Sequence, residues 1–179
     1  MPAMTLGRPD LLLEAARAGD SDAFAELLRP HLGRAATVAA AVTGSRDDGA
    51  DAVQTALVGA WRGLRSIRDA NAFGAWFHRL VVRAALKQAE RRRTRSVRLV
   101  ARVTTPDEAS TVAERLSLVQ AFAELSAGDR SIVALRYVLG YGIEETAAAL
   151  GIPIGTAKSR SHYALQRMRD AYDPAGDLR

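Results

Sequence analysis

Hydrophobic residues recur every three or four positions along most of the chain, which is the spacing of amphipathic helices. Between 52 and 64 the apolar positions are Ala52, Val53, Ala56, Leu57, Ala60, Trp61 and Leu64. No run has a convincing two-residue period, and the abundant alanine, leucine and arginine favour helix, so the pattern predicts an all-α protein. The predicted helices cover 11–18, 22–42, 48–67, 72–93, 116–125, 127–138, 142–150 and 153–171.

Two local signals refine the second of these helices. Asp20 or Ser21 is expected to cap its N-terminus, because a short polar side chain there can accept a hydrogen bond from the first free N–H groups. Pro30 lies inside the same helix and has no backbone N–H to donate. We therefore expect a break or kink near Arg29–His31.

The helical pattern stops once, between Thr94 and Glu114. This segment contains Thr-Thr-Pro-Asp-Glu and changes from basic to acidic charge, features that are typical of a linker. We therefore predict two small helical domains, over 1–95 and 116–173. A flexible linker over 96–115 is expected to join them, and a tail over 174–179 to follow.

The composition excludes several kinds of protein and site. The chain has 179 residues and no cysteine, which excludes a disulfide scaffold, a thiolate nucleophile and any zinc site that needs sulfur. Residues 1–7 lack the basic-then-apolar order of a secretory signal. The longest apolar stretch, near 39–42, is far shorter than the roughly 20 residues that span a membrane. We expect a cytoplasmic protein without a membrane span.

The positive charge is concentrated in one part of the sequence. The formal net charge is +5, but residues 62–102 hold twelve basic and two acidic residues, a balance of +10. Residues 1–61 have a balance of −3, residues 103–117 of −2, and residues 118–179 are neutral. A basic block of this kind indicates a polyanionic partner, such as nucleic acid.

Residues 142–160 have the features of a helix-turn-helix. Ala147 is small where two helices would touch, Gly151 permits a left-handed turn, and Pro153 suits the first turn of the second helix. That helix has an inward stripe at Ile154, Ala157, Ser161, Ala164, Leu165 and Met168. Its outward face carries Thr156, Lys158, Ser159, Arg160, His162, Tyr163, Gln166 and Arg167. The combination favours DNA binding over the alternative, a packed helical hairpin with a solvated face.

Aromatic residues are interleaved with the basic block. Arginine can hold a nucleic-acid backbone, and an exposed aromatic ring can stack on an unpaired base. Phe73, Trp76, Phe77 and Leu80 share helical spacing, however, so most of them are expected in the core. Of these residues, Trp76 is the one we expect at the edge of the core, facing DNA. The arginine run over 91–95 either binds a polyanion or forms part of the linker.

Nothing in the sequence supports an enzyme. The three histidines, His31, His78 and His162, are far apart and fall in no ligand motif. No phosphate-binding glycine loop, nucleophile elbow or paired acidic metal motif is found, so we expect no catalytic residue, metal or cofactor. The alternative that stays open is a stand-alone helix-turn-helix regulator whose N-terminal domain senses a ligand or dimerises. The basic, aromatic segment over 62–95 argues against it.

Three segments in this order resemble the sigma-70 superfamily of bacterial transcription initiation factors. DGADAVQTALVGAWR over 48–62 is similar to the family's Asp/Glu-Asp-x-x-Gln…Ala-Trp helix, and FGAWFHRL over 73–80 resembles its Phe-x-x-Trp-Leu-x-Arg-Ile. GIPIGTAKSR over 151–160 is close to Gly-x-x-x-Gly-Thr-Val-Lys-Ser-Arg. The short two-domain form resembles the extracytoplasmic-function (ECF, group IV) type.

The resemblance implies a partner and a site for each segment. In this family the first domain binds the clamp helices of the largest RNA polymerase subunit, and the matching positions here are Asp48, Asp51, Gln54, Leu57 and Trp61. The next unit opens the −10 promoter element and reads it as single strand, which implies Arg62, Arg65, Arg68, Asn71, Trp76, Arg79, Arg83 and Lys87. Arg83 stands where many relatives carry Asn.

The resemblance also implies how the C-terminal third acts. The helix-turn-helix would read the −35 element as duplex DNA and touch the flap of the second polymerase subunit. The implied residues are Pro153, Thr156, Lys158, Ser159, Arg160, His162, Tyr163 and Arg167. Family members are commonly held inactive by an anti-sigma factor, so such a partner is expected here as well.

Overall fold

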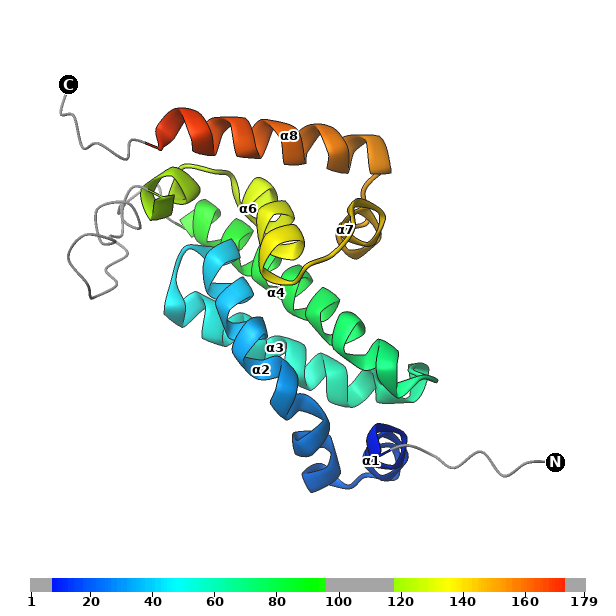
Figure 1. The fold of residues 1–179 in the computed structure, drawn as a ribbon. Helices are drawn as coiled ribbons and strands as arrows, with labels where there is room; N and C mark the ends of the chain where they lie inside the picture. Colours follow the sequence, from blue (N-terminus) through cyan, green and yellow to red (C-terminus); the bar gives the residue numbers. More distant parts are fainter. Residues whose placement is uncertain (1–7, 96–117, 173–179) are drawn as a thin grey trace, which may run out of the picture.

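The computed structural model describes residues 8–95 and 118–172, and every regular element within them is a helix. The prediction of an all-α protein is confirmed. Figure 1 shows the elements in two groups, with the C-terminal helices lying across one side of the N-terminal bundle. The bundle consists of α1 Arg8–Arg17, α2 Ser21–Thr43, α3 Arg46–Gly63, η1 Leu64–Ser66, η2 Ala70–Ala72 and α4 Phe73–Arg95. The second group consists of helical residues 118–123, α6 Ala127–Val133, η3 Ala134–Val138, α7 Ile143–Leu150 and α8 Ile154–Ala171.

Side-chain and glycine caps define the ends of the long helices. Asp20 caps α2, as expected, since its carboxylate accepts hydrogen bonds from the N–H groups of Asp22 at 2.9 Å and Ala23 at 3.0 Å. Gly44 ends α2 in the left-handed conformation, with φ +72°. Ser45 then caps α3 by accepting from the Asp48 N–H at 3.3 Å.

Pro30 does not interrupt α2: of the break or kink expected near Arg29–His31, the break does not occur. The helix is continuous from Ser21 to Thr43. Its buried face lies on both sides of the proline, at Ala23, Leu27, Leu28, Ala35, Val38, Ala39 and Val42. Packing along this whole face outweighs the single hydrogen bond that the missing N–H removes.

The core of the bundle lies between α2, α3 and α4. Phe73 and Phe77 are fully buried, with parallel rings whose centroids are 6.2 Å apart. Val38, Val81 and Val82 complete the apolar layer around them. The prediction that these aromatic residues belong to the core is confirmed for Phe73 and Phe77.

The helix-turn-helix packs through small residues. Ala157, Ser161 and Ala164 of α8 are buried, as the inward stripe predicts. The same stripe was wrong for Ile154 and Leu165, which are 45% and 36% exposed. At about 100° per residue both lie on one edge of the stripe, so the face of α8 that its neighbours cover is narrower than its apolar face.

The linker predicted over 96–115 and the tail predicted over 174–179 lie outside the described residues. Within the described ranges, no helix combines the length and apolar character that crossing a bilayer would require.

Candidate nucleic-acid interface

The turn between α7 and α8 has the conformation that the sequence predicts for a helix-turn-helix. Gly151 is left-handed, with φ +66° and ψ +35°, and Ala147 is buried where the two helices meet. The start of α7 is secured by the Glu145 carboxylate, which accepts a hydrogen bond from the Gly142 N–H at 2.8 Å. Pro153 follows the turn and precedes the first residue of α8. The angle between α7 and α8 is therefore determined by residues within the turn itself.

The outward face of α8 presents polar and aromatic side chains to solvent. Thr156 is half-buried, and Tyr163 is the most exposed aromatic residue among the described ones, at 61%. The exposed predicted residues are Pro153, Lys158, Ser159, Arg160, His162, Tyr163 and Arg167. This set supplies cationic, hydroxyl and imidazole donors on one helix, which is the form in which duplex DNA is read in its major groove.

Arg167 has a carboxylate neighbour. Its Nη1 lies 3.7 Å from Oδ2 of Asp129, which also accepts a hydrogen bond from the Ser126 hydroxyl at 2.7 Å. The Arg167 side chain is 69% exposed, so the pair is a weak surface contact that phosphate could replace.

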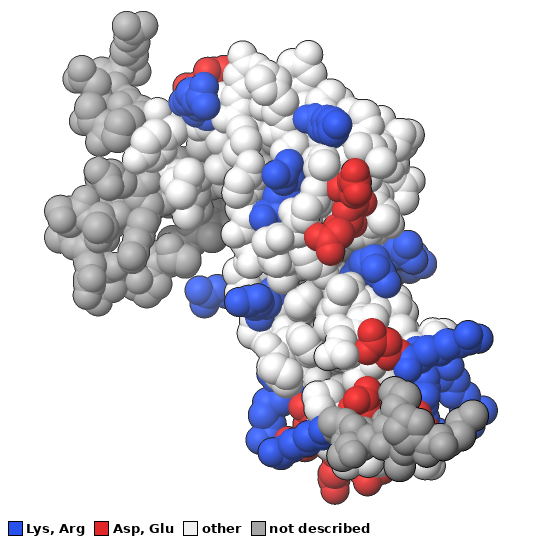
Figure 2. Space-filling view, turned by 45° about the vertical axis from the view of Figure 1, so that its right-hand side comes forward, with Lys and Arg blue, Asp and Glu red and all other residues white. Residues whose placement is uncertain are grey.

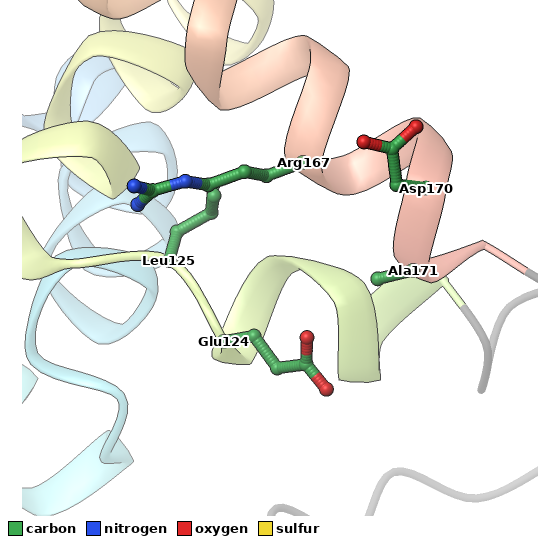
Figure 3. Close-up of a pocket in the computed structure, with 5 residues that line it drawn as sticks. All are labelled: Glu124, Leu125, Arg167, Asp170 and Ala171. Carbon is green, nitrogen blue, oxygen red and sulfur yellow. The ribbon is translucent and has the colours of Figure 1, made fainter.

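A hollow of about 470 Å³ lies beside the C-terminal half of α8. Its lining residues directly follow the helical segment 118–123 or lie in the last turns of α8 (Figure 3). They are Glu124, Leu125, Arg167, Asp170 and Ala171. The two carboxylates would repel phosphate, so the hollow is not a favourable surface for DNA.

The predicted −10 residues surround the connection from α3 to α4. Leu64, Ile67 and Ala70 are buried and hold this connection on the bundle. Exposed polar residues alternate with them: Arg62 before Leu64, Arg65 and Arg68 between the buried positions, and Asn71 after Ala70. On α4, Arg83 and Lys87 are exposed and Arg79 is half-buried. On the face shown in Figure 2, basic side chains form several groups with acidic ones between them, rather than one continuous band.

Trp76 is packed more tightly than a free stacking platform would be. It is half-buried against the core, with its ring centroid 5.8 Å from that of Phe73. A Cβ at Gly63, near the end of α3, would lie only 3.0 Å from Cζ2 of Trp76. One edge of the indole is therefore fixed against α3, and only the remainder is accessible.

The exposed face of α3 forms a stripe, which we call the α3 face, made of Asp51, Gln54, Val58 and Trp61. Val58 is 52% exposed and Trp61 42%, and the Trp61 ring meets Phe24 edge to face at 5.0 Å. Two solvated apolar side chains beside two polar ones on one helix are typical of a protein-docking surface. Val58 is not among the residues that the resemblance implies, although its position four residues after Gln54 and three before Trp61 places it between them.

The structure separates the other two predicted docking residues from this stripe. Leu57 is half-buried and packs against the core. Oδ2 of Asp48 accepts from Nη1 of Arg92 on α4 at 3.0 Å, and its Oδ1 lies 3.4 Å from Nε2 of Gln88. Asp48 thus joins the first turn of α3 to the basic end of α4.

Two histidines pack against each other between α2 and α4, His78 buried and His31 half-buried. The rings of His31 and His78 are 5.6 Å apart, and Nε2 of His78 is buried without a hydrogen-bond partner among the described residues. Burial and the nearby charge of Arg34 lower the pKa of His31. Burial, together with the charge of His31, lowers the pKa of His78. The fold therefore favours the neutral form of both rings.

This pair predicts that stability decreases in acid. Because both pKa values lie below the ordinary 6.5 in the folded chain, the neutral pair contributes its full stability above about pH 6.5 and loses it as the pH falls below. The melting temperature should therefore fall between pH 7.5 and 5, and His78→Phe should make that decrease shallower. Circular-dichroism melts of both chains across this range test the prediction, and parallel profiles would contradict it.

No group of three or more His, Cys, Asp or Glu side chains within the described ranges is arranged to hold a metal ion.

Comparisons with known proteins match both halves of the chain. Residues 27–95 match the family profile described as Sigma-70 region 2, and residues 115–168 match that described as Sigma-70, region 4. The chain is 33% identical over 158 residues to the ECF RNA polymerase sigma factor SigM of Mycobacterium tuberculosis, covering 88% of this chain and 81% of the relative. It is 37% identical over 131 residues to the RNA polymerase sigma-E factor of Streptomyces antibioticus, covering 69% of each.

A solved structure is similar over nearly the same length. The sigma factor RpoE of Bartonella quintana, solved in complex with the anti-sigma factor NepR, superposes with a TM-score of 0.70 and 25% identity. The similarity covers 83% of this chain and 95% of that one.

Proposed function

The chain belongs to the sigma-70 family, among its ECF RNA polymerase sigma factors. From this premise we propose which of its surfaces binds polymerase and which bind the promoter elements. As an alternative sigma factor it binds bacterial core RNA polymerase and directs transcription initiation at specific promoters. The profile match over 27–95 disfavours a stand-alone helix-turn-helix regulator, because such a regulator does not need this segment.

The α3 face is the proposed site for the clamp helices of the largest polymerase subunit. Val58 and Trp61 would supply the apolar contact, and Asp51 and Gln54 the polar contacts around it. Asp48 and Leu57 then support this site without contacting polymerase, because Asp48 pairs with Arg92 and Leu57 packs against the core.

The connection from α3 to α4 is the proposed −10 site. Arg62, Arg65, Arg68 and Asn71 are exposed on a segment whose buried residues hold it in place. Such a surface can hold the backbone of a melted strand, and the accessible edge of Trp76 can contact a base. Arg79, Arg83 and Lys87 extend the same surface along α4.

The exposed face of α8 is the proposed −35 site, with Lys158, Ser159, Arg160, His162 and Tyr163 directed at duplex DNA. The neutral charge of residues 118–179 means that affinity there depends on a few placed side chains rather than on bulk charge.

The same helical group is proposed to contact the flap of the second polymerase subunit. An anti-sigma factor is a further expected partner, because the similar sigma factor RpoE was solved in complex with the anti-sigma factor NepR. We place the protein in the cytoplasm, with no catalytic activity and no cofactor of its own.

One observation carries this proposal: a helix-turn-helix with a solvated polar face lies in the same chain as the exposed basic connection from α3 to α4 and the α3 face. Run-off transcription with bacterial core polymerase tests it directly. The chain should direct initiation from specific start sites on a genomic promoter library. A chain that binds duplex operators as a dimer and does not co-elute with core polymerase would contradict it.

Substituting Arg160 by Ala should weaken initiation that depends on a −35 element. Loss of one well-placed contact to a base or phosphate is worth about 1–3 kcal/mol, or about 5- to 150-fold in promoter affinity. Arg169→Ala is the matched control, because it removes the same charge from the last turn of α8. Equal affinities of the two variants for a −35 duplex, measured by fluorescence anisotropy, would exclude Arg160 from the recognition surface.

A further inference from the structure

From residue 155 to residue 166, the charged side chains of α8 lie at the two margins of its outward face. The small residues that are buried against α6 and α7 define the inner side of the helix. At about 100° per residue, Ser159 lies opposite that side, with Lys158 at one margin and Arg160 at the other. The exposed residues nearest to the line through Ser159 are neutral: Gly155, His162, Tyr163 and Gln166. The middle of the face therefore differs in chemistry from its margins.

The arginine margin lies beside the start of α6. A Cβ at Gly128 would lie 3.4 Å from Nη1 of Arg160, and Nη1 of Arg167 is 3.7 Å from Oδ2 of Asp129. Both guanidinium groups therefore lie toward α6 rather than over the middle of the face. Cations at the edge of a recognition helix can hold the DNA backbone, which fixes the position of the protein but carries no sequence information. Discrimination between base pairs then depends on the neutral middle.

Ser159 presents a hydrogen-bond acceptor to the DNA. Its hydroxyl donates to the carbonyl of Thr156 at 3.1 Å, so its hydrogen is used within the helix. The remaining lone pairs of the oxygen can accept from an exocyclic amino group, which adenine and cytosine display in the major groove. Guanine displays only acceptors there and has no hydrogen to donate to this position.

Two aromatic rings stand on the turn that follows Ser159. The rings of His162 and Tyr163 meet edge to face with centroids 5.7 Å apart, and Tyr163 is 61% exposed. Nothing lies within 4 Å of a Cβ at Gly155, so the first turn of α8 is open and lets a base edge approach the helix closely. The apolar group that the major groove offers to such rings is the C5-methyl of thymine.

We propose that the middle of this face recognises A·T pairs in the −35 element, with His162 and Tyr163 as specificity-determining residues that contact the thymine C5-methyl. An A·T pair displays an amino group and a methyl group on the same edge, and these are the groups that Ser159 and the two rings can bind. The inference rests on the −35 role proposed for α8 above, and it adds the chemical group that α8 distinguishes.

Replacing thymine by deoxyuridine tests the methyl contact, because the two nucleotides pair alike and differ only in the C5-methyl. The probe is a fluorescent duplex that carries the −35 element of a promoter found by run-off transcription, and the chain is assembled with core polymerase. Each thymine of either strand is replaced in turn. At one or two positions within the element the affinity should fall about three- to fivefold, as expected for the loss of one buried methyl group. Thymines outside the element should be replaceable without effect.

Variants of exposed residues on α8 show which side chains contact the methyl, and none of them should change the helical content. Tyr163→Ala and His162→Ala should each remove most of the difference in affinity between the thymine and deoxyuridine duplexes. Tyr163→Phe keeps the ring and should keep the difference. Arg160→Ala should weaken binding of both duplexes by the same factor, and Arg169→Ala in the last turn should leave both affinities unchanged.

Equal affinities of the parent assembly for the thymine and deoxyuridine duplexes at every position would overturn the methyl contact. A −35 element without an A·T pair would also overturn it, as would a difference that both Tyr163→Ala and His162→Ala leave intact. Each of these results leaves the sigma-factor function in place, because the promoter was found by run-off transcription. Failure of the parent chain in run-off transcription would instead contradict that function and, with it, the methyl contact.

Discussion

Val58→Asp is expected to abolish most of the affinity for core polymerase and, with it, run-off transcription. Val58 lies at the centre of the α3 face, 52% exposed, between Gln54 and Trp61. A carboxylate there would have to be desolvated against an apolar partner surface, and central interface positions of this kind cost about 2 kcal/mol or more, roughly thirtyfold in affinity. Titration of labelled chain with core polymerase measures the loss.

The control for this variant is Leu11→Asp on α1, which introduces the same charge at a site that is 56% exposed. Both variants should keep the helical content and melting temperature of the parent, since neither side chain is part of the core. Leu11→Asp should bind core polymerase normally. If Val58→Asp also binds normally, the polymerase docks elsewhere and the role of the α3 face is refuted.

Gly49→Ala should strongly destabilise the bundle. A Cβ at Gly49 would lie 2.7 Å from the backbone nitrogen of Ala40 and 2.8 Å from its Cα, so α2 and α3 would have to move apart. Overpacking against backbone costs up to about 3 kcal/mol in the free energy of unfolding. The melting temperature should accordingly fall by about 5–10 °C in a circular-dichroism melt.

Gly59→Ala provides the opposite expectation on the same helix. Nothing lies within 4 Å of a Cβ at Gly59, so alanine should stabilise α3 by about 0.5–1 kcal/mol through its higher helix propensity. The sign of the change should therefore differ between the two glycines. If Gly49→Ala stabilised the protein instead, the backbones of α2 and α3 would have to lie further apart at this crossing than the structure shows.

Much of the helix-turn-helix could be predicted from the sequence because its determinants are local. The left-handed turn at Gly151 and the small contact at Ala147 follow from backbone sterics within one motif, and both were confirmed. The inward stripe was less accurate at Ile154 and Leu165. Periodicity gives the direction of a side chain but not the width of the surface that a neighbouring helix covers.

The α3 face shows that sequence patterns are equally limited in predicting non-local contacts. The residues that the resemblance implies on this helix include Asp48 and Leu57, which lie off the exposed α3 face, but not Val58, which lies on it. Asp48 differs because Arg92, 44 residues later, reaches its carboxylate. Such a contact depends on how α3 and α4 pack, which no local spacing specifies.

The sequence by itself determined that this protein is helical, that its basic charge is concentrated over 62–102, and that a helix-turn-helix ends the described chain. These properties depend on residues close together in the sequence, where backbone geometry limits the possibilities. Only the tertiary structure decided that α2 passes unbroken through Pro30, that a Cβ at position 49 would collide with the backbone of α2, and that Arg130 of α6 binds the carbonyl of Val42 in α2. Each depends on the close approach of residues from different helices, because packing energy, rather than local propensity, selects those contacts.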